Sequence, residues 1–274
     1  MPQNGKVHVG VGGWTFEPWR GGAFYPNGLS QKRELEHASR QLTSIEINGT
    51  YYGSQKPASF RKWHDETPDD FVFSVKGPRF ATNRRVLAEA GESIERFFGT
   101  GVLELKDKLG PVLWQLLPTK QFDPDDFAAF LKLLPGSVEG RPIRHAVELR
   151  HASFVSADFV ALAREHGVAI VLAGDCEHPQ IADVTAPFVY ARLMGSSEAE
   201  PTGYSAAALD RWAERARLFA AGGAPDDLAS VGALAHEPAP RDVFLYVISG
   251  FKPRNPAAAM ALLERLREQS RSAA

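Results

Sequence analysis

Eight short apolar runs recur along this 274-residue chain, and most are followed by a segment whose apolar residues have helical spacing. Strands and helices that alternate in this way are typical of a parallel sheet covered by helices, and eight repeats predict an α/β fold of the (β/α)₈ or TIM-barrel type. Because one such barrel takes about 250 residues, we expect residues 1–274 to form a single domain. The runs are residues 7–13, 43–49, 71–77, 111–118, 145–150, 168–175, 188–195 and 243–250.

The segments between the runs differ in how clearly they predict helices. Asp123-Pro124 is a capping residue followed by a proline at the first helical position, and it predicts a helix that extends to Leu134. Residues 94–108 have the pattern of one continuous helix. The connection between the sixth and seventh runs is so short that we expect only a single helical turn at residues 179–183. Residues 77–93 are expected to form a long loop, which in a compact domain is usually functional or mobile.

Composition excludes several classes of protein. The 31 Lys and Arg residues nearly balance the 33 Asp and Glu residues, so there is no global positive field to attract nucleic acid or anionic lipid. Cys176 is the single cysteine, which excludes an internal disulfide and a cysteine-based zinc site. The sequence contains no signal-peptide pattern and no apolar run of about 18 residues. We therefore expect a cytoplasmic protein with no membrane partner.

Polar side chains stand near the carboxyl ends of several predicted strands. Because side chains alternate along a strand, Glu46 and Asn48 are expected to share one face, and Glu148 and Arg150 another. Active sites of this fold lie where the strands end. We therefore predict a ligand site at the barrel mouth, built from Glu46, Asn48, Lys76, Gln115, Glu148, Arg150 and Arg192.

The alternative is that the same residues form a structural network that closes the apolar layers of the barrel, since buried carboxylates must be paired. The location favours a ligand, because characterised enzymes of this fold use this face, and both interpretations are compatible. Three cations, Lys76, Arg150 and Arg192, face two carboxylates, which indicates affinity for a small anionic or polar ligand. Lys76 is also the best candidate for a pKa lowered by burial.

Glu46, Glu148 and Lys76 are the candidate catalytic residues. The second and fifth strands stand three apart around the barrel, so the two carboxyls have the placement of an acid and base pair, as in a glycoside hydrolase. Metal ligation would depend on these carboxylates with Asp175, His151 or His178, and the sequence has no HxH or HExxH motif. We predict no metal and no cofactor.

Two loops add candidate contacts. The stretch from Lys76 to Arg85 combines basic residues with Phe80, like a phosphate or nucleic-acid contact strip, and its alternative interpretation is a solvated charge run. The loop after the first strand is rich in aromatic residues, which either stack on a sugar or base or only pack the loop. We include Trp14 from this loop in the predicted substrate site.

Motifs spread along the chain resemble those of one family. The chain resembles the domain of unknown function 72 family, also called YecE-like, a group of (β/α)₈-barrel proteins. The resemblance implies the fold and no particular activity, and it places the family's polar mouth residues at the seven positions already selected. The motifs are GGW (12–14), SIEINGTYYGSQKPASFRKW (44–63), TPDDFVFSVKGPR (67–79), LGPVLWQLLP (109–118) and VELRHASF (147–154).

The chain departs from that family's pattern at the mouth. Asn83 and Met194 stand where many members have histidine, and Ile248-Ser249 stands where the last strand often ends in an asparagine pair. No acid, base or metal-binding role of those histidines can be transferred to this chain, which resembles a divergent branch.

The leading functional hypothesis is a hydrolase or lyase acting on a small phosphorylated or acidic substrate. Arg150, Arg192 and Lys76 would hold the anion, with Glu148 or Glu46 as general base. On this hypothesis Glu148→Gln abolishes turnover and leaves thermal stability nearly unchanged. The alternatives are a nucleic-acid-binding, repair-type phosphodiesterase that uses metal-bound water, which is less favoured, and a ligand-binding protein without catalysis.

Overall fold

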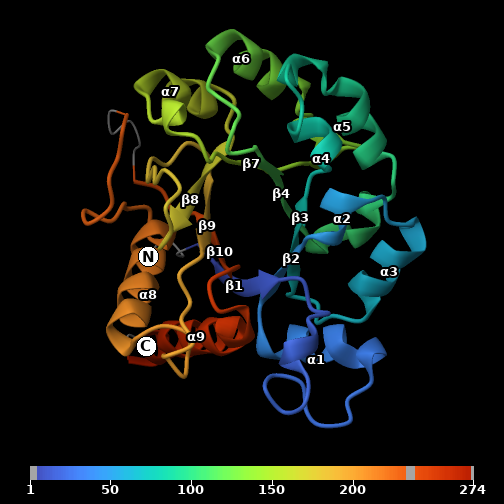
Figure 1. Ribbon diagram of the computed structural model, residues 1–274, viewed down its shortest axis with the longest axis vertical. Helices are drawn as coiled ribbons and strands as arrows, with labels where there is room; N and C mark the ends of the chain where they lie inside the picture. Colours follow the sequence, from blue (N-terminus) through green and yellow to red (C-terminus); the bar gives the residue numbers. More distant parts are fainter. Residues whose placement is uncertain (1–4, 233–237, 273–274) are drawn as a thin grey trace.

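The computed structural model describes residues 5–232 and 238–272. Eight parallel strands close into a barrel in the order β1-β10-β9-β8-β7-β4-β3-β2, with helices around its outside (Figure 1). The predicted fold class is therefore confirmed. The strands are β1 Val7–Gly12, β2 Ser44–Ile47, β3 Val72–Lys76, β4 Leu109–Gln115, β7 His145–Glu148, β8 Ala169–Gly174, β9 Phe188–Leu193 and β10 Asp242–Val247.

Helices cover the barrel where the sequence has helical spacing. The Asp123 side chain accepts hydrogen bonds from the backbone amides of Asp125 and Asp126, as expected of the cap before Pro124. A small hairpin of β5 Ser137–Val138 and β6 Arg141–Pro142 precedes β7. The helices are α1 Glu34–Gln41, α2 Gly49–Tyr52, α3 Pro57–Asp65, α4 Arg79–Thr82, α5 Gly91–Phe98, α6 Pro124–Leu133, α7 Ala157–Glu165, α8 Ala206–Ala220 and α9 Asn255–Ser272.

The expectation of one helix over residues 94–108 was wrong. The α-helix ends at Phe98, and a 3₁₀ segment, Val102–Lys108, continues towards β4. Gly101 separates the two with a left-handed backbone, φ 92°, which ends a regular helix at little cost for glycine. A side chain there would also contact the ring of Pro57 in α3. Both the backbone conformation and the close approach to α3 therefore require glycine at this break.

The expectation of a helical turn at residues 179–183 was also wrong. This segment is held by hydrogen bonds to a stretch almost fifty residues later. The amide of Ala182 donates to the carbonyl of Ala229 (3.0 Å), and the Asp183 carboxylate accepts from the amides of Val231 (2.7 Å) and Gly232 (2.9 Å). Because these long-range bonds satisfy polar groups of the segment, it needs no helix of its own.

The segment expected to be a long loop, residues 77–93, contains the short helix α4 and a 3₁₀ turn, Leu87–Glu89.

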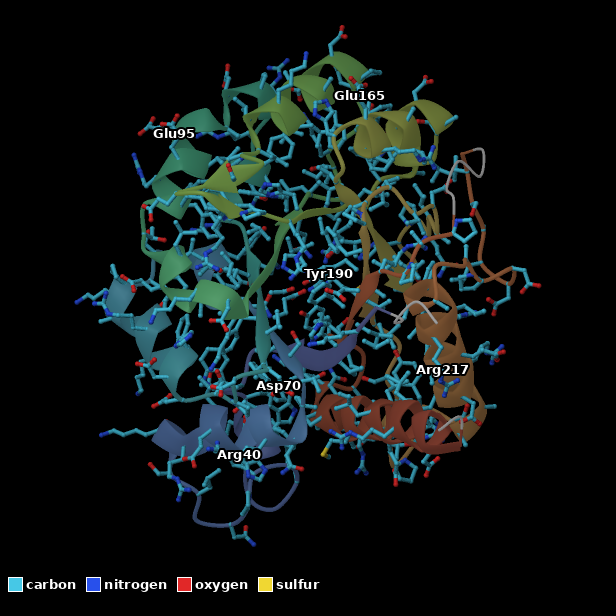
Figure 2. All side chains as sticks on the ribbon, turned by 180° about the vertical axis from the view of Figure 1, so that it is seen from behind. Arg40, Asp70, Glu95, Glu165, Tyr190 and Arg217 are labelled. Atoms are coloured by element: carbon cyan, nitrogen blue, oxygen red, sulfur yellow. The ribbon has the colours of Figure 1, made fainter. Side chains whose placement is uncertain are left out.

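The inside of the barrel changes from mainly aromatic to mainly charged side chains along its axis. Near the amino-terminal ends of the strands, His8 stacks on Phe244 with ring centroids 4.9 Å apart, and the Arg144 guanidinium lies over the same ring. Tyr190 and Tyr246 pack in the middle, and Figure 2 places Tyr190 near the centre of the molecule. Charged side chains fill the end where the strands finish. The apolar layers therefore form a floor under a polar mouth.

No helix in the described part of the chain is both long enough and apolar enough to cross a bilayer.

Gly77, directly after β3, tests how tightly the layer between the barrel and its covering helices is packed. A β-carbon at Gly77 would lie 2.4 Å from the ring of Trp114, which is fully buried. We expect Gly77→Ala to lower the free energy of unfolding by about 1–3 kcal/mol, the usual cost of overpacking a core. The control is Gly136→Ala, because nothing lies within 4 Å of a β-carbon there. Equal denaturation midpoints for the two variants would contradict this packing argument.

Candidate functional site

Arg192 of β9 joins two buried carboxylates at the end of the barrel. Its Nη2 donates to Glu46 Oε1 (3.0 Å) and its Nε to Glu46 Oε2 (3.1 Å), a bidentate pair with β2 across the barrel. Its Nη1 donates to Glu148 Oε2 of β7. Arg192 is 2% exposed and both glutamates are fully buried. The guanidinium therefore bridges two strands, and the two carboxylates raise its pKa although burial opposes this.

Every acceptor position of Glu148 is occupied. Gln115 Nε2 donates to both carboxylate oxygens (3.0 Å each), Arg150 Nε donates to Oε1 (2.7 Å), and Arg192 donates to Oε2. Burial alone would raise the pKa of Glu148, but the two arginines and these hydrogen bonds lower it to about 2. Glu148 is therefore an anion at any physiological pH and a weak base.

Lys76 has different surroundings. Its ammonium donates to Gln115 Oε1 (2.9 Å) and lies 4.2 Å from the centre of the Tyr51 ring, and within the described residues it forms no ion pair within 4 Å. Burial lowers its pKa from 10.5 to about 8, which the nearby carboxylates only partly offset. Both protonation states of Lys76 are therefore populated near pH 8.

Tyrosines of the middle layer support the mouth from below. Tyr190 donates its hydroxyl to Glu46 Oε2 (2.7 Å), so this carboxylate accepts three hydrogen bonds. Tyr246 donates to Ser74 Oγ (2.8 Å) and lies 2.7 Å from Ser44 Oγ. Sequence reasoning selected neither tyrosine, although Tyr190 lies two residues before Arg192 on β9 and Tyr246 lies within the last apolar run. The inward alternation along each strand was the signal that could have found them.

Arg150 and Asn48 lie at the rim. The Arg150 side chain is 24% exposed, so part of its guanidinium faces solvent while Nε holds Glu148. Asn48 was expected to be on the strand beside Glu46, but β2 ends at Ile47 and Asn48 has helical backbone angles before α2. Its amide nitrogen lies near the carbonyl of Glu46 (3.4 Å) and close to Gly12. Asn48 therefore reaches the mouth from the loop.

Trp14 packs away from this network. Its ring lies edge-on to Trp63 of α3 (centroids 5.2 Å apart) and near Phe73, which belongs to the core outside the barrel. Trp14 also lines an open groove of about 490 Å³ that includes Asn48 and Lys252. Among the described residues, no ring contact or side-chain hydrogen bond joins Trp14 to the charged side chains of the mouth, so Trp14 borders the site through the groove alone.

The segment after β8 forms part of the surroundings. Asp175 has a positive φ of 56°, a rare conformation for a non-glycine residue, and its carboxylate accepts from Trp212 Nε1 (2.8 Å). His178 follows in this segment; burial and the positive charge of Arg150 lower its pKa. Cys176 is half-buried, and burial raises its pKa. Sequence reasoning considered Asp175 and His178 as possible metal ligands, and it used Cys176 only to exclude a disulfide and a cysteine-based zinc site.

The positions that depart from the family pattern have structural partners. Asn83 Oδ1 accepts from the Tyr51 hydroxyl (3.3 Å), and the Ile248 side chain packs on the apolar interior beside Gly12. The carbonyl of Ser249 accepts from Ser196 Oγ (2.8 Å), and the amide of Met194 donates to the carbonyl of Gly174 (3.0 Å). At the end of the last strand, the side chain of Ile248 is therefore apolar, where an asparagine would have been polar.

The expected basic strip between Lys76 and Arg85 is not one surface. Lys76 points into the mouth, whereas Arg84 lines a pocket between α2, α4 and α5 and Arg79 lies over the Phe80 ring (5.3 Å). The α4 turn divides these cations because it redirects the chain after Gly77. No group of three His, Cys, Asp or Glu side chains in residues 5–232 and 238–272 is arranged to hold a metal ion.

Barrel topology, an apolar floor and a charged mouth where the strands end together define a (β/α)₈-barrel protein of the kind whose ligand sites lie at that face. The chain belongs to the family described as protein of unknown function DUF72, whose model matches residues 8–274.

Curated relatives and a solved structure agree with this assignment. The UPF0759 protein YecE of Escherichia coli strain K12 is 28% identical over 151 residues, 54% of this chain and 50% of that protein. The UPF0759 protein YunF of Bacillus subtilis strain 168 is 24% identical over 192 residues, 67% and 64% of the two chains. The match thus spans half to two thirds of these relatives. A DUF72 family protein from Thermotoga maritima has the same fold, with TM-score 0.70, 22% identity and coverage of 97% and 99%.

Glu148 is expected to be important for stability, which corrects the expectation that Glu148→Gln leaves stability nearly unchanged. Removal of its charge leaves Arg192 and Arg150 only partly compensated, so we expect a loss of about 3 kcal/mol at pH 7 by urea denaturation. Because the folded-state pKa is lowered from 4.5 to about 2, the wild type loses this contribution as the pH falls from 4.5 towards 2. The variant is expected to lack that acid-dependent loss.

The matched control is Glu92→Gln, since Glu92 pairs with Arg96 on the surface with both side chains more than 70% exposed. An exposed pair contributes little, so its stability is expected to change by less than about 0.5 kcal/mol. If Glu148→Gln were no more destabilising than this control, the proposed role of Glu148 would be wrong.

Lys76 gives a prediction at alkaline pH. Its folded-state pKa is about 8 and its ordinary value is 10.5, so between these values the unfolded chain binds more protons and stability rises with pH. We expect the wild type to gain up to about 3 kcal/mol relative to Lys76→Met between pH 7 and pH 10.5. Denaturation curves across this range measure the difference. Parallel stability profiles of the two proteins would show that the Lys76 pKa is not lowered.

Proposed function

We propose that this protein is a hydrolase or lyase whose barrel mouth binds a small phosphorylated or acidic substrate. The observation that carries the proposal is the excess of cations over carboxylates in the network. Lys76, Arg150 and Arg192 supply three positive charges and Glu46 and Glu148 supply two negative ones, a net charge of 3 − 2 = +1 when Lys76 is protonated. A small anion would balance this charge.

The three cations have different roles in this proposal. Arg192 is saturated by its two carboxylates and is almost inaccessible, so it organises the site and does not hold the substrate directly. Arg150 keeps part of its guanidinium exposed, and Lys76 is free of a carboxylate partner within hydrogen-bond distance among the described residues. Arg150 and Lys76 are therefore the groups proposed to contact the anion.

Lys76 is proposed as the proton-transfer group. A general acid or base works best when its pKa is near the working pH, and a pKa of about 8 satisfies this condition. The protonated amine would donate to a leaving group, and the neutral amine would accept a proton from water or from a carbon acid. Gln115 holds the amine in place through the 2.9 Å hydrogen bond.

The carboxylates hold the cations and, in this proposal, transfer no proton. Glu148 has a pKa of about 2 and no unoccupied acceptor position, and Glu46 accepts from Tyr190 and Arg192. A glycoside hydrolase needs one carboxylic acid with a raised pKa. Arg192 between the two glutamates gives Glu148 the opposite shift. We therefore assign Glu46 and Glu148 as positioning residues and do not propose glycoside hydrolysis.

We do not propose the alternative of a metal-dependent phosphodiesterase acting on nucleic acid. That reaction requires a cluster of carboxylate or imidazole ligands, and the described residues offer no group of three. The cations of residues 76–85 also point to different places, so they form no continuous strip for a nucleic-acid backbone. A ligand-binding protein without catalysis is the alternative that the experiment below distinguishes.

Calorimetric titration with inorganic phosphate at pH 7 tests the anion site. We expect Arg150→Gln and Lys76→Met each to weaken binding by about tenfold or more, the usual effect of losing a charge-assisted hydrogen bond. The control Arg40→Gln lies on α1, exposed on the outer surface (Figure 2), and should change affinity by less than twofold. The proposal fails if both mouth variants bind phosphate as the wild type does.

Catalysis is tested by incubating the protein with a panel of phosphomonoesters and phosphorylated hydroxy acids and following products by ³¹P NMR. We expect turnover that rises with pH around 8 if Lys76 acts as base, or falls there if it acts as acid, and that Lys76→Met abolishes. Anion binding that depends on Arg150 without any product would support the non-catalytic alternative.

A further inference from the structure

A pocket of about 270 Å³ opens beside the mouth, between α2, α4 and α5, which lie next to one another on one side of the barrel (Figure 1). Its volume is close to the lower end, about 300 Å³, of typical small-molecule sites. Residues with both aromatic and charged side chains line it, among them Tyr51, Phe80, Arg84, Ser93 and Phe97. No part of the proposed catalytic network lines this pocket.

Arg84 is held in a fixed position and has no anionic partner. Its Nε donates to the carbonyl of Phe80 (2.6 Å) and its Nη2 to Ser93 Oγ (2.9 Å). Within the described residues it forms no ion pair, although most of the other arginines with buried or half-buried side chains do. Two hydrogen bonds thus orient a guanidinium whose remaining donors are free for a ligand.

The other charged residues of the pocket cancel one another. Glu92 and Arg96 pair one helical turn apart on α5, and both side chains are more than 70% exposed. They therefore contribute no net charge to the lining. Arg84 leaves the pocket with one uncompensated positive charge, and it is the only such arginine in the described lining.

Aromatic rings supply the apolar part of the pocket. Phe80 is 61% exposed, which is unusual for a side chain of its size, whereas Phe97 is buried at 4%. The Arg79 guanidinium lies 5.3 Å from the centre of the Phe80 ring. An exposed aromatic ring that lines a pocket is available to stack on a planar ligand.

We propose that this side pocket binds a small ligand that combines one planar aromatic ring with one anionic group. Arg84 would bind the anion, a phosphate or a carboxylate, and Phe80 would pack against the ring. The two functions are adjacent because Arg84 bonds to the backbone carbonyl of Phe80 itself. This site is separate from the anion site of the mouth and does not depend on it.

Tyr51 is the wall that the pocket and the mouth share. Its ring contacts the Lys76 ammonium (4.2 Å), and its hydroxyl donates to Asn83 (3.3 Å) near the end of α4. Lys76 itself does not line the pocket. Variants at Arg84 and Phe80 therefore report on the pocket, and variants at Arg150 report on the mouth.

The experiment is a calorimetric titration of the full chain with phenyl phosphate, benzoate, inorganic phosphate and phenol. We expect phenyl phosphate or benzoate to bind more tightly than phosphate or phenol, because only the first two offer both groups. Arg84→Gln is expected to weaken binding of the aromatic anion by about tenfold or more, and Phe80→Ala by about threefold or more. The matched control is Arg85→Gln, since Arg85 lies next in the chain and outside this pocket.

Arg150→Gln separates the two sites. If aromatic-anion binding is lost in Arg150→Gln and kept in Arg84→Gln, the ligand occupies the mouth and the side-pocket proposal is overturned. It is also overturned if neither aromatic anion binds, or if phosphate alone binds as tightly as phenyl phosphate. Retained binding in Arg150→Gln with loss in Arg84→Gln supports it. Thermal denaturation of each variant without ligand verifies that the fold is intact.

Discussion

The buried ion-pair network around Arg192 is the constraint on which the mouth of this barrel depends. One guanidinium of β9 satisfies two fully buried carboxylates, Glu46 and Glu148, which come from strands on either side of β9 around the barrel. Each charge would be costly to bury alone, and the network stabilises them only while all the members are present. Tyr190 from below and Gln115 from the side complete the hydrogen bonds. The charged layer is thus fixed in position.

The fixed position of this layer explains the properties of Lys76, the cation of the layer that has no carboxylate partner among the described residues. Gln115 links Glu148 to Lys76, so the amine receives a neutral hydrogen-bond partner and, among the described residues, no carboxylate within hydrogen-bond distance. Burial then dominates, and the Lys76 pKa falls to about 8. The structural and functional interpretations of the polar residues are therefore not exclusive. The same ion pairs that close the barrel also provide the setting for a reactive amine.

Much of the fold could be predicted from the sequence, and the failures have physical causes. Alternation and repeated apolar runs reflect local burial, so they predicted the eight strands and the inward placement of Glu46, Gln115 and Arg192. The break at Gly101 depends on contact with Pro57, and the segment at 179–183 depends on bonds to residues 229–232. The bonds to residues 229–232 leave no trace in the local pattern, because the partner lies far away in the chain, whereas Gly101 itself is a local signal for a helix end.

The sequence by itself determined the barrel, its family and the set of polar residues that meet where the strands end. Only the tertiary structure decided what each of them does. The partners of a charged group set its pKa, and these partners come from separate strands. For this reason Glu148, selected as a candidate base, has all its acceptor positions occupied and a pKa of about 2, while the pKa of Lys76 is about 8. The division of the basic segment between mouth and side pocket was also decided by packing, because the α4 turn separates residues that are neighbours in sequence.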